Sequence, residues 1–178
     1  MKLRGFAIFL VVTVFSLPPA ANAKEVKADA YFGYSRTGAN LYAVYTPGMN
    51  GWQFAMHIKP MPFVGVEGDI AHYSQKVNGF SQQVTTVMFG PRVTVHAMKV
   101  SLFAHGLAGI AHQNGTVTIY PATSYDATSY ALGGGVDLPL FLSFNLRVTA
   151  DYLGNSKAPS SSYSPSPYRA GVGVAYHF

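Results

Sequence analysis

Apolar and polar residues alternate along most of the chain, and the pattern is clearest between residues 142 and 152. In this segment Leu142, Phe144, Leu146, Val148, Ala150 and Tyr152 alternate with Ser143, Asn145, Arg147, Thr149 and Asp151. Successive side chains of a β-strand point to opposite faces, so the pattern predicts a strand with one apolar and one polar face. A shift of one residue would move Arg147 and Asp151 to the apolar face, so the register of this strand is strongly determined.

The same alternation recurs often enough to predict eight strands. Six further segments show it: residues 26–35, 52–59, 64–71, 84–96, 130–138 and 168–178. Pro91 interrupts one of them and is tolerable only at a bulge or an unpaired position. The remaining segment, residues 100–112, is apolar on both faces, so its register is not assigned by the pattern.

The connections between these strands alternate in length. Four long connections are rich in Gly, Asn, Ser, Thr, Pro and Tyr and cover residues 37–51, 75–82, 113–128 and 154–167. Three short ones lie at residues 59–62 and 96–99 and around Pro139 and Leu140. Transmembrane barrels have short periplasmic turns and long extracellular loops. We therefore predict an all-β fold, an eight-stranded antiparallel up-and-down transmembrane β-barrel with both termini periplasmic.

The N-terminal segment has the three parts of a secretory signal peptide. Lys2 and Arg4 form a basic region, residues 6–17 are apolar, and Ala21 and Ala23 frame a small-x-small cleavage site. The apolar run is shorter than the roughly 20 residues that a membrane-spanning helix needs. We predict cleavage after Ala23, which leaves residues 24–178 as one barrel domain in a bacterial outer membrane.

Composition narrows the possible functions. The chain has no Cys, which excludes disulfides, lipoprotein anchoring and Cys-based metal sites. Charged residues make up only 11% of the chain, and removing Lys2 and Arg4 lowers the formal net charge from +5 to +3. Most of the basic residues alternate into the same face as acids, so we expect no nucleic-acid partner. The six His lack metal-ligand spacing, and no metal or cofactor site is expected.

The polar strand face collects most of the acids together with several bases. The predicted network in the barrel interior consists of Asp29, Lys59, Glu67, Asp69, Arg92, Asp137, Arg147, Asp151 and Arg169, with Lys27 nearby. Unpaired buried charges are very costly, so we expect salt bridges across the lumen. An eight-stranded barrel is just wide enough for its side chains to fill, which favours a packed interior over the alternative of a narrow, porin-like ion or solute channel.

Aromatic residues cluster at one level of the predicted apolar face. Tyr34, Trp52, Tyr130, Tyr152 and Tyr168 each lie at the strand end beside a long connection. Such a belt is typical of the interface between lipid and water, so we expect contact with outer-membrane lipid and lipopolysaccharide.

The stretches "ALGGGVDLPL", "LSFNLRVTADYLG" and the terminal "YRAGVGVAYHF" resemble the small eight-stranded outer-membrane barrels similar to the transmembrane domain of outer membrane protein A. The resemblance covers residues 24–178. It implies that the C-terminal strand, through Val174, Tyr176 and Phe178, is recognised by the barrel-assembly machinery. The best-known member carries a peptidoglycan-binding domain after its barrel. This sequence shows none, so we expect no cell-wall tethering.

We expect no enzyme, and the enzymatic alternative has one candidate motif. "IAHYSQ" places His72 and Ser74 on one strand face and resembles the His-x-Ser of outer-membrane lipid A deacylases. The Asn expected after the Ser is Gln75 here, and no outward-facing acid is evident, so we assign no catalytic residue.

A secreted lipocalin-type barrel would reverse the two faces, with an apolar lumen and a polar outside. The alternation argues against that fold. We expect a structural or surface-interacting protein whose four extracellular loops contact a ligand or surface, since binding residues tend to lie on connections held by a rigid scaffold.

Overall fold

The computed structural model describes residues 27–37, 48–77, 80–117, 120–156 and 168–178. The predicted signal peptide, with Ala21 and Ala23, lies outside the described residues, as do residues 38–47 and 157–167 of two predicted loops. The eight strands are β1 (Lys27–Thr37), β2 (Asn50–Lys59), β3 (Val64–Val77), β4 (Phe80–Ala97), β5 (Val100–Val117), β6 (Tyr120–Phe141), β7 (Phe144–Ser156) and β8 (Tyr168–His177).

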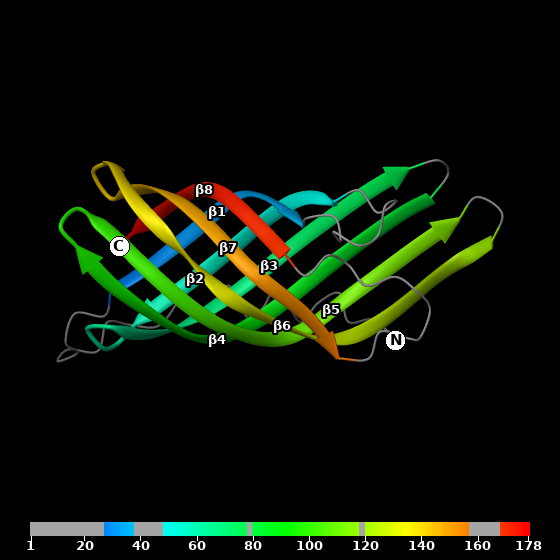
Figure 1. Ribbon diagram of the computed structural model, residues 1–178, viewed down its shortest axis with the longest axis horizontal. Coiled ribbons are helices and arrows are strands. Elements are labelled where there is room, and N and C mark those ends of the chain that lie inside the picture. The colour runs from blue at the N-terminus through cyan, green and yellow to red at the C-terminus, as the bar shows by residue number, and fades with distance from the viewer. Residues whose placement is uncertain (1–26, 38–47, 78–79, 118–119, 157–167) are drawn as a thin grey trace.

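The strands form one closed barrel in which each pairs antiparallel with its sequence neighbours, and β8 pairs with β1 (Figure 1). Backbone hydrogen bonds extend this seam to the last residue: Phe178 N donates to Ala28 O at 3.0 Å, and Ala28 N donates to Phe178 O at 3.1 Å. The predicted all-β, eight-stranded up-and-down barrel is confirmed. Among the described residues, no helix has the length and hydrophobicity needed to cross a membrane.

The barrel has a polar inside and an apolar outside. Arg92, Arg147 and Arg169 are each only 1% exposed, whereas Phe89 is 70% and Leu132 59% exposed. The lipocalin alternative requires the reverse arrangement and is therefore excluded by the structure. Apolar surface that runs around a whole barrel is typical of a protein that faces lipid.

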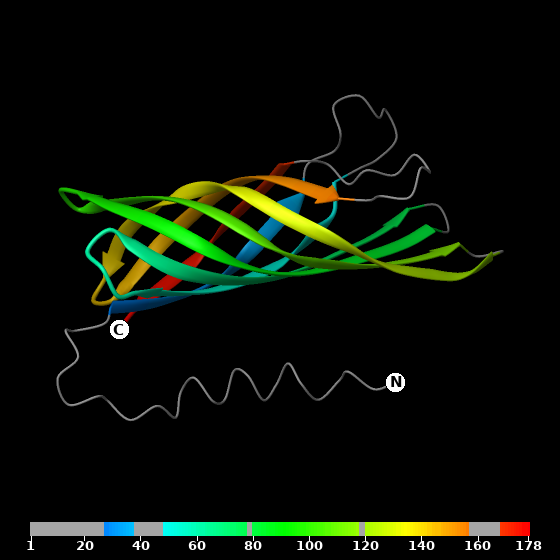
Figure 2. The ribbon, with the colours of Figure 1, turned by 90° about the horizontal axis from the view of Figure 1, so that it is seen from below.

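One end of the barrel carries short connections and both described chain ends, and we call it the turn end (Figure 2). Pro60 to Phe63 join β2 to β3, and two-residue turns at Met98–Lys99 and Leu142–Ser143 join the next pairs. The turn predicted around Pro139 and Leu140 is wrong. Strand β6 continues to Phe141 because Pro139 still pairs with Asn145 beside a bulge.

At the opposite end, which we call the hairpin end, two predicted loops are strands instead. Residues 75–77 and 80–82 still pair as β3 and β4, and residues 113–117 pair with residues 120–125 as β5 and β6. These stretches read as loops because their apolar alternation stops. Apolar and polar residues alternate only where one face of a strand contacts lipid. Where a strand extends beyond the lipid layer, the alternation stops although the backbone pairing continues.

The result is a projecting sheet formed by the hairpin-end parts of β3, β4, β5 and β6. Figure 1 shows these four strands extending past β1, β7 and β8. The last β6–β7 pair is Thr128 with Ser156, whereas β6 continues to pair with β5 as far as Tyr120.

The structure also determines the strand whose register the sequence left open. In β5, Phe103, His105, Leu107, Ala111 and Gln113 are buried in the interior, and Leu102 and Ile110 face outward. Pro91 in β4 lies where the ladder to β5 is interrupted, since the described pairs pass from Phe89–Ala108 to Arg92–His105.

Candidate functional site: an ion-paired interior

The interior polar face brings charged side chains from all parts of the barrel into contact, and Arg147 of β7 is at the centre. Its Nε donates to Asp137 Oδ1 at 2.6 Å and its Nη2 to Asp137 Oδ2 at 2.7 Å, a bidentate pair with β6. The same Nη2 donates to Asp29 Oδ1 of β1 at 2.7 Å. Bidentate Arg–carboxylate pairs are among the strongest and most directional hydrogen bonds in proteins.

Arg92 of β4 also contacts these acids, and the residues together form the cluster that lies closer to the turn end. Its Nη1 donates to Glu67 Oε2 at 3.1 Å and lies 3.5 Å from Asp29 Oδ1, and its Nη2 lies 3.6 Å from Asp137 Oδ2. The guanidinium also stands 3.7 Å above the ring centroid of Phe103, whose ring lies 5.0 Å from the Arg147 guanidinium. The aromatic ring thus contacts two cations that would otherwise repel each other.

A second cluster lies closer to the hairpin end, around Arg169 of β8. Its Nε donates to Asp151 Oδ2 at 2.6 Å and its Nη1 to Asp69 Oδ1 at 2.8 Å. The second oxygen of Asp69 accepts from Gln53 Nε2 of β2 at 2.6 Å. Both Asp69 oxygens therefore have a buried partner, which offsets the cost of removing the carboxylate from water.

His105 of β5 joins the two clusters. Its Nδ1 lies 3.0 Å from Glu67 Oε1 and its Nε2 lies 2.8 Å from Asp151 Oδ1. A neutral imidazole has only one N–H, so two bonds to carboxylates require the doubly protonated, cationic ring. His57 of β2 contacts Asp29 Oδ2 through Nδ1 at 2.8 Å. Every strand of the barrel thus contributes to one network.

Glycines on the interior face make room for these side chains. A Cβ at Gly133 would collide with Asp151 Oδ1, and a Cβ at Gly65 would collide with His57 Nε2. The small residues of the polar face are therefore part of the packing of the charged ones.

The structure brings together eight of the nine residues predicted for the interior network. Asp29, Glu67, Asp69, Arg92, Asp137, Arg147, Asp151 and Arg169 are all buried and ion-paired with one another. Lys59 is not among them. As the last residue of β2 it is half-buried at the turn end, and it makes no ion pair with a carboxylate of the described residues because the acids lie deeper in the barrel.

Sequence reasoning missed His105, Phe103 and the bridging roles of His57 and Gln53. His57 and Gln53 fell on the correct face but carry no fixed charge, and β5 had no assigned register. One usable signal was available: Ser101, His105 and Gln113 share the same parity in an otherwise apolar strand.

The predicted belt residues lie on the outer surface. Tyr34, Trp52, Tyr130, Tyr152 and Tyr168 are between 41% and 54% exposed. Two pairs are direct register partners, Tyr34 with Trp52 and Tyr152 with Tyr168. At the other end Tyr176 and Phe178 are also exposed, with ring centroids 5.8 Å apart, and Val174 is exposed on the same strand face.

The His72 and Ser74 motif lies outside the barrel, near the hairpin end. His72 Nδ1 is 2.9 Å from Thr85 Oγ1, and its ring packs at 6.2 Å against Trp52. Ser74 is exposed opposite Asn50. In the described part of the chain, no cluster of three or more His, Cys, Asp or Glu has an arrangement that would hold a metal ion.

Comparison with solved structures finds barrels of the same size. Ail, the attachment invasion locus protein of Yersinia pestis, is 19% identical with a TM-score of 0.59, over 87% of this chain and 100% of that one. Neisserial surface protein A is 9% identical with a TM-score of 0.60, over 88% and 97%. The N-terminal barrel of Pseudomonas aeruginosa OprF is 17% identical with a TM-score of 0.56, over 88% and 100%. At these identities the likeness shows the fold.

No curated protein sequence matches the chain. The family described as the outer membrane protein beta-barrel domain matches residues 7–178, which is nearly the whole chain. Together with the closed eight-stranded barrel and its apolar outer face, this match locates the protein in the bacterial outer membrane. The chain belongs to the outer membrane protein beta-barrel domain family.

Proposed function

We propose that this protein is a closed outer-membrane barrel that makes contacts at the cell surface, with the hairpin end outside the cell and the turn end in the periplasm. The observation that carries the proposal is the projecting sheet of β3 to β6, which extends beyond the ends of the other strands. Short turns on the periplasmic side and longer elements outside are the usual arrangement in this class of barrel.

The projecting sheet offers a specific kind of contact surface. In β6, residues 120–127 pair with β5 but have no β7 partner among the described residues. An edge of this kind presents backbone N–H and C=O groups to which an extended segment of another protein can add as a further strand. The exposed side chains of this stretch are polar where they are described: His112 and Asp126 form a pair at 2.5 Å, and Ser124 is exposed.

The interior supports a closed barrel better than the alternative of a narrow channel. The three buried arginines are each held by two or more acids, and His105 spans the gap between the two clusters. An ion crossing this layer would have to break several buried charge pairs, each of which is costly to leave unpaired. Transport is therefore not the role that we propose.

The orientation is tested first. The chain has no Cys, so single cysteines at Ser124 and at Lys99 report on the two ends without background. Intact cells that express S124C or K99C are treated with a membrane-impermeant maleimide. Labelling of S124C alone is expected. Labelling of K99C alone would contradict the orientation.

The contact role is tested with a trimmed protein. Residues 114–124 are replaced by Asn-Gly, which closes the β5–β6 hairpin on the register pair Gln113 and Tyr125. The matched control replaces residues 76–81 and closes β3–β4 on Gln75 and Gln82. Cells with the native protein should adhere to epithelial monolayers better than cells with the β5–β6 trim, and the β3–β4 trim should retain more adhesion. Equal adhesion by all strains, or steady conductance of the native barrel in planar bilayers, would argue against the proposal.

A further inference from the structure

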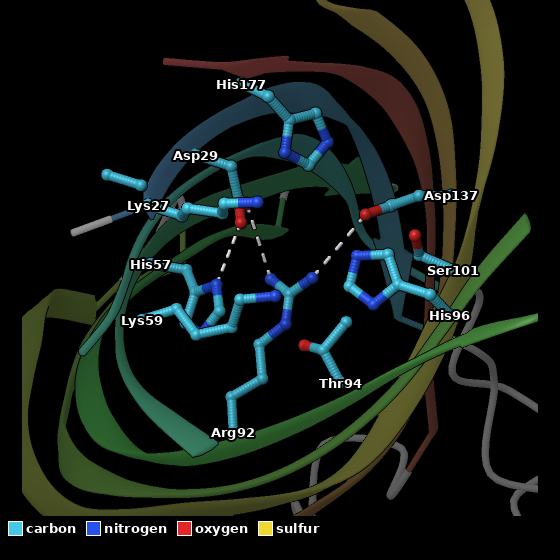
Figure 3. Close-up of a pocket in the computed structure, with 11 residues that line it drawn as sticks. Lys27, Asp29, His57, Lys59, Arg92, Thr94, His96, Ser101, Asp137 and His177 are labelled. Atoms are coloured by element: carbon cyan, nitrogen blue, oxygen red, sulfur yellow. Dashed lines mark hydrogen bonds and ion pairs between the residues drawn. The ribbon is translucent and has the colours of Figure 1, made fainter. Parts of the chain in front are cut away.

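A polar cavity of about 60 Å³ lies inside the barrel at the turn end, between the ion-paired layer and the opening (Figure 3). Lys27, Lys59, His96 and His177 line it near the opening, and Asp29, Arg92 and Asp137 line its floor. None of the interactions described above uses the two lysines. The cavity therefore has two cationic side chains that the ion-paired network below it does not use.

Positive charge is in excess around this cavity. Lys27 and Lys59 are direct register partners on β1 and β2, and Figure 3 shows both side chains at the cavity. Like charges that face each other across paired strands destabilise a sheet. Neither lysine forms an ion pair with a carboxylate of the described residues. The acids of the floor are already engaged, since Asp29 contacts Arg147 and His57, and Asp137 is held bidentately by Arg147.

Buried donors at the cavity also lack acceptors. Arg92 Nε and Thr94 Oγ1 have no hydrogen-bond partner among the described residues, although Arg92 is 1% and Thr94 5% exposed. Both residues lie on the same face of β4 and both line the cavity. The Arg92 Nε can only donate, so its partner must be an acceptor. Buried polar groups in folded proteins are nearly always satisfied, which points to a bound group with acceptor atoms.

We propose that this cavity binds a tetrahedral oxyanion of the phosphate class. A buried water occupies about 10–15 Å³ on this scale, so the cavity has room for roughly four to six water-sized positions, enough for four oxygens around one centre. An anion with two negative charges would offset the repulsion between Lys27 and Lys59. Its oxygens would accept from the two ammonium groups and from Arg92 Nε and Thr94 Oγ1.

The binding experiment uses the folded full-length mature barrel in a maltoside detergent and a phosphate-free buffer of low ionic strength. Isothermal titration calorimetry with inorganic phosphate is expected to show one saturable site. In K27Q/K59Q, phosphate binding should weaken at least tenfold, and in T94V severalfold. K99Q removes a lysine of the adjacent turn that does not line the cavity, and its affinity should match that of the native protein.

The source of the phosphate group is resolved by a second titrant. Glycerol 3-phosphate that binds as tightly as inorganic phosphate would indicate the phosphate end of a larger molecule, such as a lipid headgroup. Binding of inorganic phosphate alone would indicate the free ion. Either result supports the site.

Three results would overturn the proposal. They are no saturable binding of phosphate, equal phosphate affinity in the native protein and K27Q/K59Q, or an equal loss of affinity in K99Q, which would show that any positive charge nearby has the same effect.

A stability comparison guards against misfolded variants. Without phosphate, K59Q should unfold at a higher temperature than the native protein because one of two facing charges is gone. Added phosphate should reverse that order. Since the measurements use detergent-solubilised protein, they are independent of membrane orientation and of any adhesive role.

Discussion

Arg147 and Asp29 stand 118 positions apart in the chain, yet Arg147 Nη2 donates to Asp29 Oδ1 over 2.7 Å inside the barrel. Strand β8 separates the two strands that carry them, and the residue of β8 paired with Arg147 is Gly173. The long arginine side chain therefore reaches past β8 to β1. The contact bridges the seam where the chain closes on itself, so it depends on complete barrel closure.

The first prediction concerns this arginine. Arg147→Met should lower the free energy of unfolding by about 3–5 kcal/mol, because it leaves Asp137 and Asp29 buried with too few cationic partners. Unfolding in urea with lipid vesicles, followed by the fluorescence of the only tryptophan, Trp52, gives the measurement.

The double variant R147M/D137N tests whether the loss of stability in R147M comes from a buried acid left without its partner or from removal of the arginine itself. It removes both main partners, and Asp29 keeps its contacts with His57 and Arg92, so it should be more stable than R147M alone. Lys99→Gln, at an exposed turn, serves as control and should change stability by no more than about 0.5 kcal/mol. A double variant less stable than the single one would contradict this account.

The two-residue turns at the turn end lead to a second prediction. Met98 and Leu142 have φ angles of 52° and 50°, in the left-handed region, and their side chains are fully exposed. A residue with a Cβ costs roughly 1–2 kcal/mol there, and Asn tolerates the region better than Met or Leu. Leu142→Asn should therefore raise the free energy of unfolding by up to about 1 kcal/mol.

The neighbouring position provides the matched control for this change. Lys99 follows Met98 in the other two-residue turn of the turn end and is not among the described non-glycine residues with a positive φ. Met98→Asn should stabilise the barrel in the same urea titration, whereas Lys99→Asn should not. Stabilisation by both substitutions would mean that polarity at the turn, and not backbone conformation, is responsible.

The strand faces and the overall barrel were predictable from sequence because lipid and lumen impose different side chains on alternate residues. In β7 and β8 this signal is strong, and the predicted faces agree with burial from Arg147 to Tyr152 and along β8. In β5 it is weak, because Phe103, Leu107 and Ala111 are apolar residues of the interior face. Apolar side chains can also lie inside the barrel, so alternation alone did not assign the register of β5.

The individual ion pairs were less predictable, because alternation gives the face of a side chain but not its neighbours. Asp137 and Arg147 are register partners only because the turn lies at Leu142–Ser143. The turn expected at Pro139 and Leu140 would have paired Asp137 with a different residue. Similarly, the bridge through His105 depends on the protonation of an imidazole, which counting fixed charges does not include.

A third prediction tests the lipid-facing surface. Val148 lies on the outward face of β7, midway between Phe144 and the belt residue Tyr152, and is 40% exposed. An arginine near the middle of the lipid layer costs about 2–4 kcal/mol and one near the interface about 0–1 kcal/mol. Val148→Arg should therefore lower the free energy of unfolding in vesicles by the larger amount.

Thr128 is the control for depth. It is exposed on β6, two residues beyond the belt residue Tyr130 toward the projecting sheet. Thr128→Arg should leave stability almost unchanged. If both arginines were equally harmful, the boundary of the lipid layer would not lie at the belt. If both were harmless, the outer face would not contact lipid.

The last prediction separates folding from recognition at the C-terminus. The Phe178 backbone closes the seam through two hydrogen bonds with Ala28, but its ring is 54% exposed and packs beside Tyr176. Phe178→Ala keeps the backbone bonds, so refolding of purified protein into vesicles should proceed nearly as it does for the native chain. In cells, the same variant should accumulate poorly in the outer membrane, because the assembly machinery would no longer recognise an aromatic C-terminus.

The control is Phe63→Ala, which removes a similarly exposed ring (59%) at the same end of the barrel. The fraction of heat-modifiable protein in isolated outer membranes measures the difference. Loss confined to F178A in cells supports recognition, whereas equal loss in vesicles would mean that the ring is needed for folding itself.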